Sequence, residues 1–248
     1  MSPRIETAFP NSTFRFCPFP VRIAEIYESR QGEGLLTGQP SVFVRTSGCN
    51  LRCWFCDTPF TSWEPEGEDW DLADIVAKME TFASRHVVIT GGEPMLFAEL
   101  VPLTERLRRD GWHVTIETAG TLDLAVQCDL MSISPKLANS LPSVDKAGAW
   151  TERHERSRHR PEVIRRLTAD YDYQLKFVID QPADLEDVAR WLAEFPQLRH
   201  DRVLLMPQGT TVAELAERTA WLEPAAAAAG FVFCPREHIA WYGFARGT

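Results

Sequence analysis

Short apolar segments alternate with amphipathic ones along most of the chain. Residues 21–29 and 41–46 have the alternating, β-branched pattern of strands. Residues 71–82 instead place Leu72, Ile75 and Met79 on one face of a helix. The same rhythm predicts further strands at residues 86–90, 113–118, 130–134, 174–179, 202–206 and 231–233, and helices at residues 95–109, 184–195 and 212–229. Strands separated by helices predict a parallel sheet with right-handed crossovers, and therefore an α/β fold of the partial (β/α) barrel type.

Two segments depart from this rhythm. Residues 1–20 contain prolines and scattered phenylalanines, and we expect an extended arm that lies on the domain. Residues 137–172 include the arginine- and histidine-rich run 151–160, in which we find no apolar face. A solvated, mobile insertion is the favoured interpretation, and a local basic patch for nucleic acid is the alternative. We otherwise expect residues 1–248 to form a single domain.

Composition and charge narrow the class of protein. The 248 residues are 44% hydrophobic and 25% charged, which is ordinary for a globular domain. A net charge of −9 argues against a dedicated nucleic-acid binder, because such binding needs clustered Lys and Arg. No apolar run approaches the roughly 20 residues of a membrane span, and no basic-then-apolar leader begins the chain. We therefore expect a cytoplasmic protein that contacts neither nucleic acid nor membrane.

Three of the six cysteines lie within eight residues, in the segment GCNLRCWFCDT at positions 48–58. Cys49, Cys53 and Cys56 can share one centre, and three thiolates leave a fourth ligand position open. A [4Fe–4S] cluster is held by such short cysteine runs, and the spacing resembles that of radical S-adenosylmethionine enzymes. A zinc knuckle completed by a distant ligand, or unrelated buried cysteines, are the alternatives. The other cysteines, Cys17, Cys128 and Cys234, lie in apolar surroundings and are interpreted as core residues.

Glycine-rich and polar residues follow several predicted strands, which is the edge where barrel folds carry their active sites. The segment GGEP at positions 91–94 is one example. Its glycines can expose backbone groups to the ammonium of a cofactor, and Glu93 can accept a hydrogen bond from that ammonium. A simple turn between strand and helix explains the same residues.

Several motifs together resemble the 7-carboxy-7-deazaguanine synthase family. They are QGEG at 31–34, FVR at 43–45, the cysteine segment with its CDT ending at 58, TGGEP at 90–94, SPK at 134–136 and LMPQG at 205–209. The resemblance implies a radical S-adenosylmethionine lyase of queuosine and deazapurine biosynthesis. Such an enzyme abstracts hydrogen from C6 of 6-carboxy-5,6,7,8-tetrahydropterin, and ring contraction then yields 7-carboxy-7-deazaguanine and ammonia.

The resemblance also implies roles for individual residues. Cofactor contacts would come from Phe55, Cys56, Asp57, Gly92, Glu93, Ser134, Pro135, Lys136 and Gln208. Substrate contacts would come from Arg30, Gln31, Gly32, Glu33, Arg45, Thr90 and His238, with Arg45 as the partner of a carboxylate. Thr58 would be a ligand of Mg²⁺, which prefers oxygen donors and few protein ligands. No catalytic side chain is expected beyond the cluster and the cofactor radical.

The same resemblance implies a pterin as small-molecule substrate, an electron donor such as flavodoxin, and a homodimer. Two parts of the chain depart from the family pattern: the charged segment 137–172, and the C-terminal run around His238. Two other functions stay open at this point. One is a glycyl-radical-enzyme activase, which shares the cysteine spacing, and the other is a non-catalytic iron–sulfur protein of electron transfer.

Overall fold

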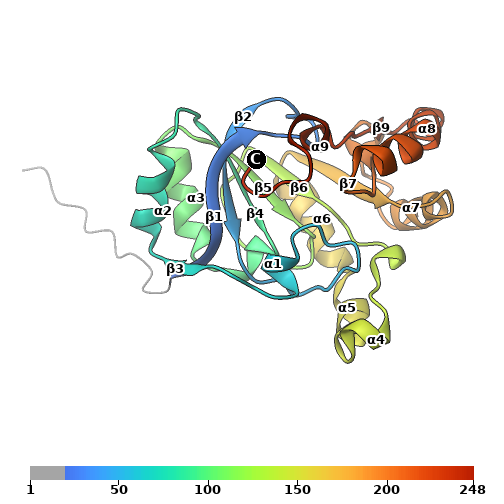
Figure 1. The fold of residues 1–248 in the computed structure, drawn as a ribbon, viewed down its shortest axis with the longest axis horizontal. Coiled ribbons are helices and arrows are strands. Elements are labelled where there is room, and N and C mark those ends of the chain that lie inside the picture. The colour runs from blue at the N-terminus through green and yellow to red at the C-terminus, as the bar shows by residue number, and fades with distance from the viewer. Residues whose placement is uncertain (1–19) are drawn as a thin grey trace, which may run out of the picture.

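A curved sheet organises residues 20–248, the part of the chain that the computed structural model describes (Figure 1). Its strands are β1 (Val21–Arg30), β2 (Pro40–Thr46), β3 (Glu68–Trp70), β4 (His86–Gly91), β5 (His113–Thr118), β6 (Leu130–Ile133), β7 (Tyr173–Ile179), β8 (Val203–Pro207) and β9 (Val232–Phe233). They lie in the order β3-β1-β2-β4-β5-β6-β7-β8-β9. From β2 onward every pairing is parallel, whereas β1 is antiparallel to both of its neighbours. The sheet is thus open, as expected for a partial barrel.

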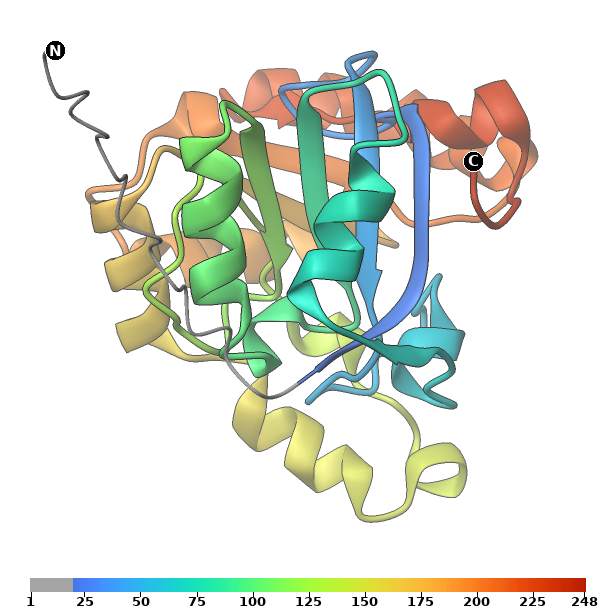
Figure 2. The ribbon, with the colours of Figure 1, turned by 90° about the vertical axis from the view of Figure 1, so that its left-hand side faces the viewer.

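Helices and 3₁₀ turns connect the strands of residues 20–248. They are α1 (Pro59–Ser62), α2 (Leu72–Met79), α3 (Leu100–Arg109), α4 (Val144–Ala147), α5 (Trp150–Ser157), α6 (Pro161–Asp170), α7 (Asp184–Ala193), α8 (Val212–Ala228) and α9 (Glu237–Tyr242), with 3₁₀ turns η1 (Pro94–Leu96), η2 (Ala138–Ser140) and η3 (His200–Arg202). Figure 2 shows α2 and α3 side by side against the strands. The small α4 and α5 project from one end of the molecule.

Alternation along the parallel strands separates the core from the concave face of the sheet. On β5, Val114 and Ile116 are buried in the hydrophobic core, whereas Glu117 lines a cavity. Ser132 on β6 pairs in register with Glu117, and Lys176 on β7 lines the same cavity. The concave face is therefore polar and is free to hold a ligand.

Most of the predicted elements are confirmed, with small shifts at their ends. The helix expected at residues 95–109 is the largest exception, because α3 begins only at Leu100. Met95 and Leu96 belong instead to η1, where the Glu93 carboxylate accepts the Met95 N–H at 3.1 Å. The sequence pattern also missed β3, α1 and α9. The predicted arm, residues 1–20, lies outside the described residues apart from Pro20.

The expectation that residues 137–172 offer no apolar face is wrong. Helix α6 buries Val163, Ile164 and Leu167 against the sheet, and so it is the crossover between β6 and β7. Charged residues between these positions obscured their helical spacing. His154, in the middle of the arginine-rich run, is fully buried as well. Only α4 and the exposed side of α5 resemble a solvated insertion.

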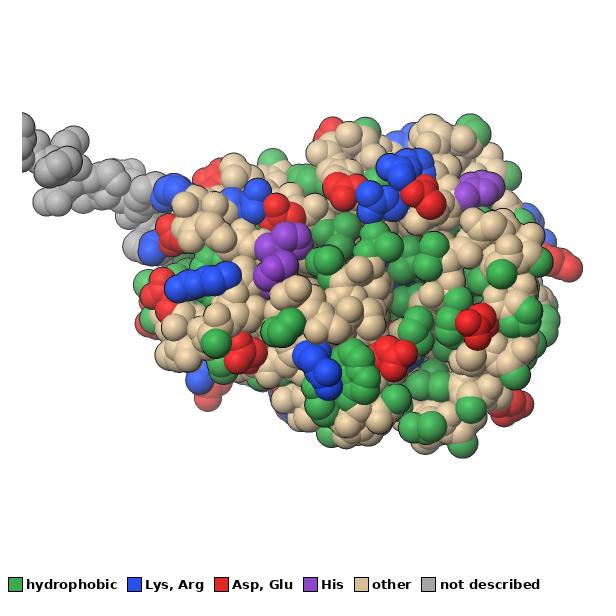
Figure 3. Space-filling view, turned by 90° about the horizontal axis from the view of Figure 1, so that it is seen from above, with side chains coloured by type: hydrophobic (Ala, Val, Ile, Leu, Met, Phe, Trp, Pro, Cys, Tyr) green, Lys and Arg blue, Asp and Glu red, His purple; other side chains and the backbone are tan. Residues whose placement is uncertain are grey.

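Outside residues 137–172, positively and negatively charged side chains are intermixed on the surface. Figure 3 shows Lys and Arg side chains next to Asp and Glu side chains over much of one face. Exposed pairs such as Arg199 with Asp201 and Arg106 with Asp110 are typical. Such pairs contribute little to stability one by one.

Candidate active site

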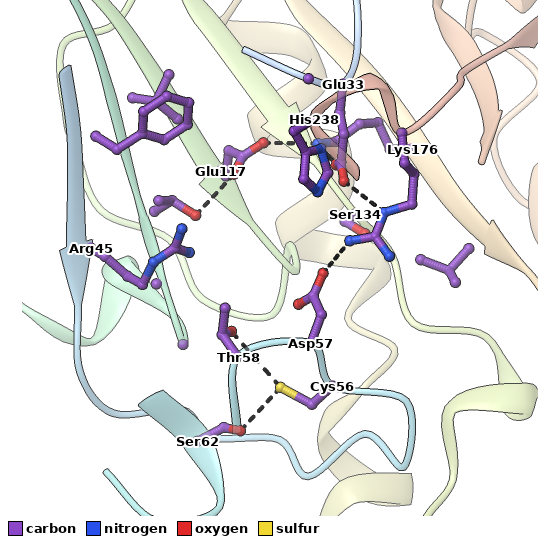
Figure 4. A pocket seen from close by; sticks show the side chains of 18 of the residues that line it. Glu33, Arg45, Cys56, Asp57, Thr58, Ser62, Glu117, Ser134, Lys176 and His238 are labelled. Atoms are coloured by element: carbon purple, nitrogen blue, oxygen red, sulfur yellow. Dashed lines mark hydrogen bonds and ion pairs between the residues drawn. The ribbon is translucent and has the colours of Figure 1, made fainter. Parts of the chain in front are cut away.

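One cavity of about 520 Å³ opens on the concave face of the sheet (Figure 4). Almost every residue singled out in the sequence lines it. The lining includes Arg30, Gln31, Gly32, Glu33, Arg45, Cys49, Cys53, Phe55, Cys56, Asp57, Thr58, Thr90, Gly92, Ser134, Lys136, Gln208 and His238. Segments far apart in the chain therefore build a single site.

The three clustered cysteines face this cavity as free thiols. Cys56 Sγ lies 3.2 Å from Ser62 Oγ and 3.9 Å from Thr58 Oγ1. Burial raises the pKa of Cys49 and of Cys53 to about 12. Buried thiols ionise readily only when a cation compensates the negative charge, as metal binding does. Three thiols at the wall of a cavity fit a [4Fe–4S] cluster whose fourth iron stays accessible to a ligand.

The cysteine loop is held by the end of β4. Glu93 N donates to Gly48 O at 2.8 Å, and Gly48 N donates to Thr61 O at 2.8 Å. A Cβ at Gly92 would lie 2.2 Å from Gly48 O, so only glycine permits this approach. Gly92 also lines the cavity. The packing of the cysteine loop thus explains why position 92 is a glycine, whether or not Gly92 also contacts a cofactor.

Glu93 and Pro135 are the two predicted contact residues that do not line the cavity. Glu93 is fully buried, and its carboxylate accepts from Thr118 Oγ1 and from Ala119 N, both at 2.8 Å. Burial raises the pKa of Glu93, although these hydrogen bonds oppose the shift. The carboxylate fixes the turn after β4 and the end of β5. A direct contact between Glu93 and the cofactor's ammonium stays a prediction.

A chain of buried charges crosses the floor of the cavity (Figure 4). Lys176 Nζ donates to Glu33 Oε2 at 2.9 Å and to Glu117 Oε1 at 2.8 Å. Thr90 Oγ1 donates to Glu117 Oε2 at 2.9 Å. Arg236 binds Glu33 Oε1 at 3.0 Å and also pairs with Asp57 of the cysteine loop. The network therefore joins the QGEG loop, the cysteine loop and strands β4, β5 and β7.

These ion pairs determine whether Glu33 and Lys176 are ionised. Burial alone would raise the pKa of Glu33, but Lys176 and Arg236 hold it well below its usual range. Burial would lower the pKa of Lys176, yet the carboxylates of Glu117 and Glu33 raise it above its usual value. Glu33 and Lys176 are thus both ionised at neutral pH, and Glu33 offers a carboxylate that can accept hydrogen bonds.

Sequence reasoning missed Lys176, Glu117 and Arg236. A charged residue in the apolar strand YQLKFVI at 173–179 was a usable signal for Lys176, because buried lysines are rare unless paired. Glu117 stands at an alternate position of β5, which was a weaker signal. Nothing in the local sequence distinguishes Arg236, which reaches the site only because the chain folds back after β9.

Arg45 points into the cavity from β2 (Figure 4). It is already paired, because its Nε donates to Glu25 Oε1 at 2.7 Å and its Nη2 donates to Tyr27 OH at 2.9 Å. Although burial opposes the charged form, these partners raise the pKa of Arg45. Arg246 donates to the other oxygen of Glu25 at 3.1 Å. The guanidinium is thus held in a fixed orientation, with Glu25 between two arginines.

The C-terminal residues dock onto the QGEG loop. Glu237 N donates to Gly32 O at 2.9 Å, and a Cβ at Gly32 would lie 2.4 Å from His238 Nδ1. Arg30 stacks on the Trp241 ring at 4.4 Å. His238 therefore reaches the cavity by packing on a glycine, which explains how this loosely matching segment contributes to the site. Burial lowers the pKa of His238.

Ser134, Lys136 and Thr58 lie on the side of the cavity nearest the cysteines. Lys136 Nζ donates to Ser134 O at 2.6 Å and to Ser134 Oγ at 2.7 Å. Thr58 stands at the N-cap of α1, yet its hydroxyl makes no capping bond. It accepts instead from Thr61 Oγ1 at 3.3 Å. Its oxygen therefore keeps acceptor capacity for a cation.

The side of the cysteine loop away from the cavity rests on residues that we expected to be peripheral. Arg52 N donates to His154 Nδ1 at 3.0 Å, and His154 Nε2 lies 2.9 Å from Ser140 Oγ. Burial lowers the pKa of His154 to about 4, so the ring is neutral and accepts at Nδ1. The Arg52 guanidinium stacks on Trp150 at 3.9 Å and donates to Cys49 O at 2.8 Å. The cysteine loop is thus supported from both sides.

No helix among residues 20–248 is long and apolar enough to cross a membrane.

Comparison with known proteins gives three informative matches. The radical SAM superfamily model matches residues 43–166. A 7-carboxy-7-deazaguanine synthase of Rhodopirellula baltica is 44% identical over 91% of this chain and 88% of its own length. One of Halobacterium salinarum is 44% identical over 91% of this chain and 92% of its own length.

Among solved structures, QueE from Escherichia coli matches with a TM-score of 0.62 and 24% identity. The match covers 87% of this chain and 93% of the other, and it concerns the fold alone. The radical SAM fold agrees with the open sheet described above, and so the expected fold class is confirmed. On the strength of the two full-length relatives, this chain belongs to the 7-carboxy-7-deazaguanine synthase family of the radical SAM superfamily.

Proposed function

We propose that this protein converts 6-carboxy-5,6,7,8-tetrahydropterin into 7-carboxy-7-deazaguanine and ammonia. Membership of the family supports this proposal. The observation that carries it is that one cavity is lined both by the three cysteines and by the polar QGEG loop, Arg45 and Thr90. A radical reaction needs its cofactor and its substrate side by side, and this cavity has room for both sets of contacts.

Cys49, Cys53 and Cys56 would hold the [4Fe–4S] cluster. The neighbouring side chains Phe55, Asp57, Ser134, Lys136 and Gln208 would contact S-adenosylmethionine, because all of them line the cavity. When bound, the cluster and this cofactor supply the radical chemistry that removes a hydrogen atom from C6 of the substrate. Asp57 is held in place by Arg236, which ties the cofactor side of the site to its floor.

Glu33, Thr90, Arg45 and His238 would orient the substrate. Glu33 is kept ionised by Lys176 and Arg236, and an ionised carboxylate accepts from the ring N–H groups of a pterin. Arg45 offers a positive charge to the substrate carboxylate. Its bond to Glu25 limits the rotation of the guanidinium, which lowers the entropy lost on binding.

A Mg²⁺ ion between Thr58 and the substrate carboxylate forms part of the proposal. The Thr58 hydroxyl lines the cavity and makes no capping bond, which fits a cation ligand. Mg²⁺ usually keeps several waters and takes few protein ligands, so a single hydroxyl suffices. The metal would fix the carboxylate, and with it C6, relative to the cysteines.

Two further features of the proposal rest on the resemblance to the family, namely an electron donor such as flavodoxin and a homodimeric assembly. A cytoplasmic location is proposed from the sequence instead, because clustered metal-binding cysteines suit a reducing compartment. The substrate would be a small molecule, because the site is a concave cavity of about 520 Å³, within the range that such ligands occupy.

The two competing functions predict different surroundings for the cysteines. A non-catalytic electron-transfer protein needs no cavity beside its cluster, and the polar floor built by Glu33, Lys176 and Glu117 would then be unexplained. An activase of glycyl-radical enzymes must admit a segment of a large protein. The C-terminal residues 244–248 line this cavity, which disfavours entry of a protein segment.

The decisive experiment is anaerobic incubation of the reconstituted protein with 6-carboxytetrahydropterin, S-adenosylmethionine, Mg²⁺ and dithionite. We expect 7-carboxy-7-deazaguanine and ammonia, identified by mass spectrometry and by an ammonia assay. Cleavage of S-adenosylmethionine without either product would contradict the substrate assignment. Electron paramagnetic resonance with and without S-adenosylmethionine is the companion measurement. An unchanged spectrum would favour a cluster closed by four protein ligands.

A further inference from the structure

Three Lys or Arg side chains are buried among residues 20–248, and one of them is partnered differently from the other two. Lys176 and Arg236 each form ion pairs with two carboxylates. Arg52 is only 9% exposed, yet within this part of the chain its printed partners include no carboxylate. A buried charge without a counter-charge is strongly unfavourable. The charge of Arg52 therefore calls for a negative group that the polypeptide's carboxylates do not supply.

The contacts that Arg52 makes are all with groups that carry no net charge. Its Nη1 donates to Cys49 O at 2.8 Å and to Leu51 O at 2.7 Å. The guanidinium lies 3.9 Å from the centre of the Trp150 ring, on the projecting helix α5 (Figure 2). Carbonyl oxygens and an aromatic face hold a guanidinium in place and replace part of its hydration. They leave its positive charge without a counter-ion.

The position of Arg52 is next to the three cysteines and outside the cavity. It lies between Cys49 and Cys53 in the cysteine loop and does not line the cavity. Burial lowers the pKa of Arg52, and the groups that oppose this shift most strongly are Cys49, Cys56 and Cys53. An arginine stays protonated in proteins even so. A permanent positive charge is thus fixed beside the thiols, where it cannot touch a ligand in the cavity.

We propose that Arg52 is the counter-charge of the cysteine-bound [4Fe–4S] cluster and raises its reduction potential from outside the cavity. The proposal rests on the proposed function, since it needs the cluster that Cys49, Cys53 and Cys56 would hold. One-electron reduction, by an external reductant such as dithionite, makes the cluster more negative by one charge. No bond is made or broken. A nearby positive charge stabilises the reduced state more than the oxidised state, and local charge is one of the protein's means of setting such a potential.

The chain offers a matched control for the charge of Arg52. Arg153 lies over the same Trp150 ring, 4.3 Å from its centre, but its side chain is exposed. Solvent and salt screen an exposed charge far more than a buried one. Arg153 therefore has the same charge and the same aromatic partner as Arg52, and differs from it in burial and in its contact with the cysteine loop.

The test compares the variants Arg52→Gln, Arg52→Lys and Arg153→Gln with wild type. Glutamine removes the charge and keeps an amide donor for the loop carbonyls, whereas lysine keeps the charge and loses the planar fork. Each protein is reconstituted anaerobically, and its iron and sulfide are determined. The midpoint potential of the cluster is then measured by redox titration with electron paramagnetic resonance, in the absence of S-adenosylmethionine and substrate.

We expect Arg52→Gln to bind the cluster with a lower midpoint potential than wild type. The equilibrium constant for reduction should fall at least about tenfold, which is about 59 mV for a one-electron couple. Arg52→Lys should stay close to wild type because the charge remains. Arg153→Gln should have the wild-type potential because its charge is screened.

Three results would overturn the proposal. The first is an unchanged potential in Arg52→Gln. The second is an equal fall in Arg52→Gln and Arg153→Gln, because any charge near the loop would then act alike. The third is an equal shift, or loss of the cluster, in both Arg52→Gln and Arg52→Lys, because the geometry of the side chain rather than its charge would then be responsible. Loss of the cluster in Arg52→Gln alone would support the proposal, since only the charge-keeping variant would retain it.

This measurement is independent of the substrate. If wild type yields no 7-carboxy-7-deazaguanine, the proposed function fails, while the potentials still decide whether Arg52 acts on the cluster. If the potentials of all four proteins agree and wild type turns over, only the role of Arg52 is refuted.

Discussion

The two sides of the cysteine loop are stabilised by different kinds of contact. On the inner side, Asp57 is paired with Arg236, which also binds Glu33, so charges are neutralised by specific buried partners. On the outer side, Arg52 is stacked on Trp150, and its own N–H is accepted by a neutral histidine. On the inner side, the two cations Lys176 and Arg236 are shared by three carboxylates, so carboxylate oxygens keep acceptor capacity for a ligand. On the outer side, the buried Arg52 guanidinium is satisfied by an aromatic ring and by backbone carbonyl oxygens rather than by a carboxylate.

This difference has a physical reason. A buried charge without a partner is strongly unfavourable, so the inner side can keep Lys176 and Arg236 only with carboxylates beside them. Arg52 on the outer side is buried as well, but its guanidinium donates to Cys49 O and Leu51 O and lies over the Trp150 ring, and these contacts replace part of its lost hydration. Ion pairs thus fix the inner side of the loop, and stacking with backbone hydrogen bonds fixes the outer side.

The largest effect is expected at the three cysteine thiols on the inner side of the loop. Replacing Cys49, Cys53 or Cys56 with Ala should abolish the brown chromophore of the anaerobically reconstituted protein and all turnover. Cys128→Ala and Cys234→Ala should retain both, as should Cys17→Ala, whose residue lies outside the described part of the chain. Ultraviolet–visible absorption with iron and sulfide determination is the measurement. Loss of the cluster in any of these three controls would show that the ligand set is incomplete.

Breaking the inner charge network should have the next largest effect. Arg236→Met leaves Glu33 and Asp57 with one partner fewer, and we expect the free energy of unfolding to fall by about 2 kcal/mol. Substrate affinity should fall too, because Glu33 would lose part of its orientation. Chemical denaturation and KM provide the two readouts. Arg199→Met, at an exposed pair with Asp201, is the control and should be close to wild type.

The next largest effect is expected at the Thr58 hydroxyl, on the inner side of the cysteine loop. Thr58→Ala should lower turnover, by up to roughly 100-fold if the substrate shifts by about 1 Å, and should leave cleavage of S-adenosylmethionine possible. Added Mg²⁺ should stimulate this variant less than wild type. Thr58→Ser keeps the oxygen and should retain the response to Mg²⁺. If Thr58→Ala responds to Mg²⁺ as wild type does, the metal ligand is elsewhere.

The contact of His154 with the outer side of the cysteine loop should make the free energy of unfolding depend on pH. The pKa of His154 is about 4 in the folded protein and near 6.5 when unfolded, so the unfolded state binds the extra proton first. Its stabilising effect is complete above pH 6.5 and is lost as the pH falls toward 4. Between pH 6.5 and 5 this amounts to at most about 2 kcal/mol.

His154→Gln removes the titrating ring and should make the free energy of unfolding less dependent on pH in that interval. Denaturant titrations at several pH values are the measurement. An identical pH slope in variant and wild type would mean that His154 does not stay neutral behind the cysteine loop.

The sequence by itself was sufficient for the strands, the cysteine centre and most of the cavity. The apolar run at residues 86–90 favoured a buried strand, and three cysteines within eight residues favoured a shared centre; the strand forms, and all three cysteines line one cavity. The family resemblance assigned Thr90, Ser134 and Gln208 to one site, and their places after predicted parallel strands agreed with that assignment; all three line the cavity.

Tertiary structure alone decided the partners of those residues. Arg236 is 203 positions away from Glu33, and His154 is 102 positions away from Arg52, so no local pattern links them. The sequence pattern made residues 137–172 look fully solvated, yet the segment delivers a crossover helix and the support of the cysteine loop. Local periodicity determines which elements form, because it reflects backbone geometry. Which charges neutralise one another depends on distances in space, and only the folded chain sets those.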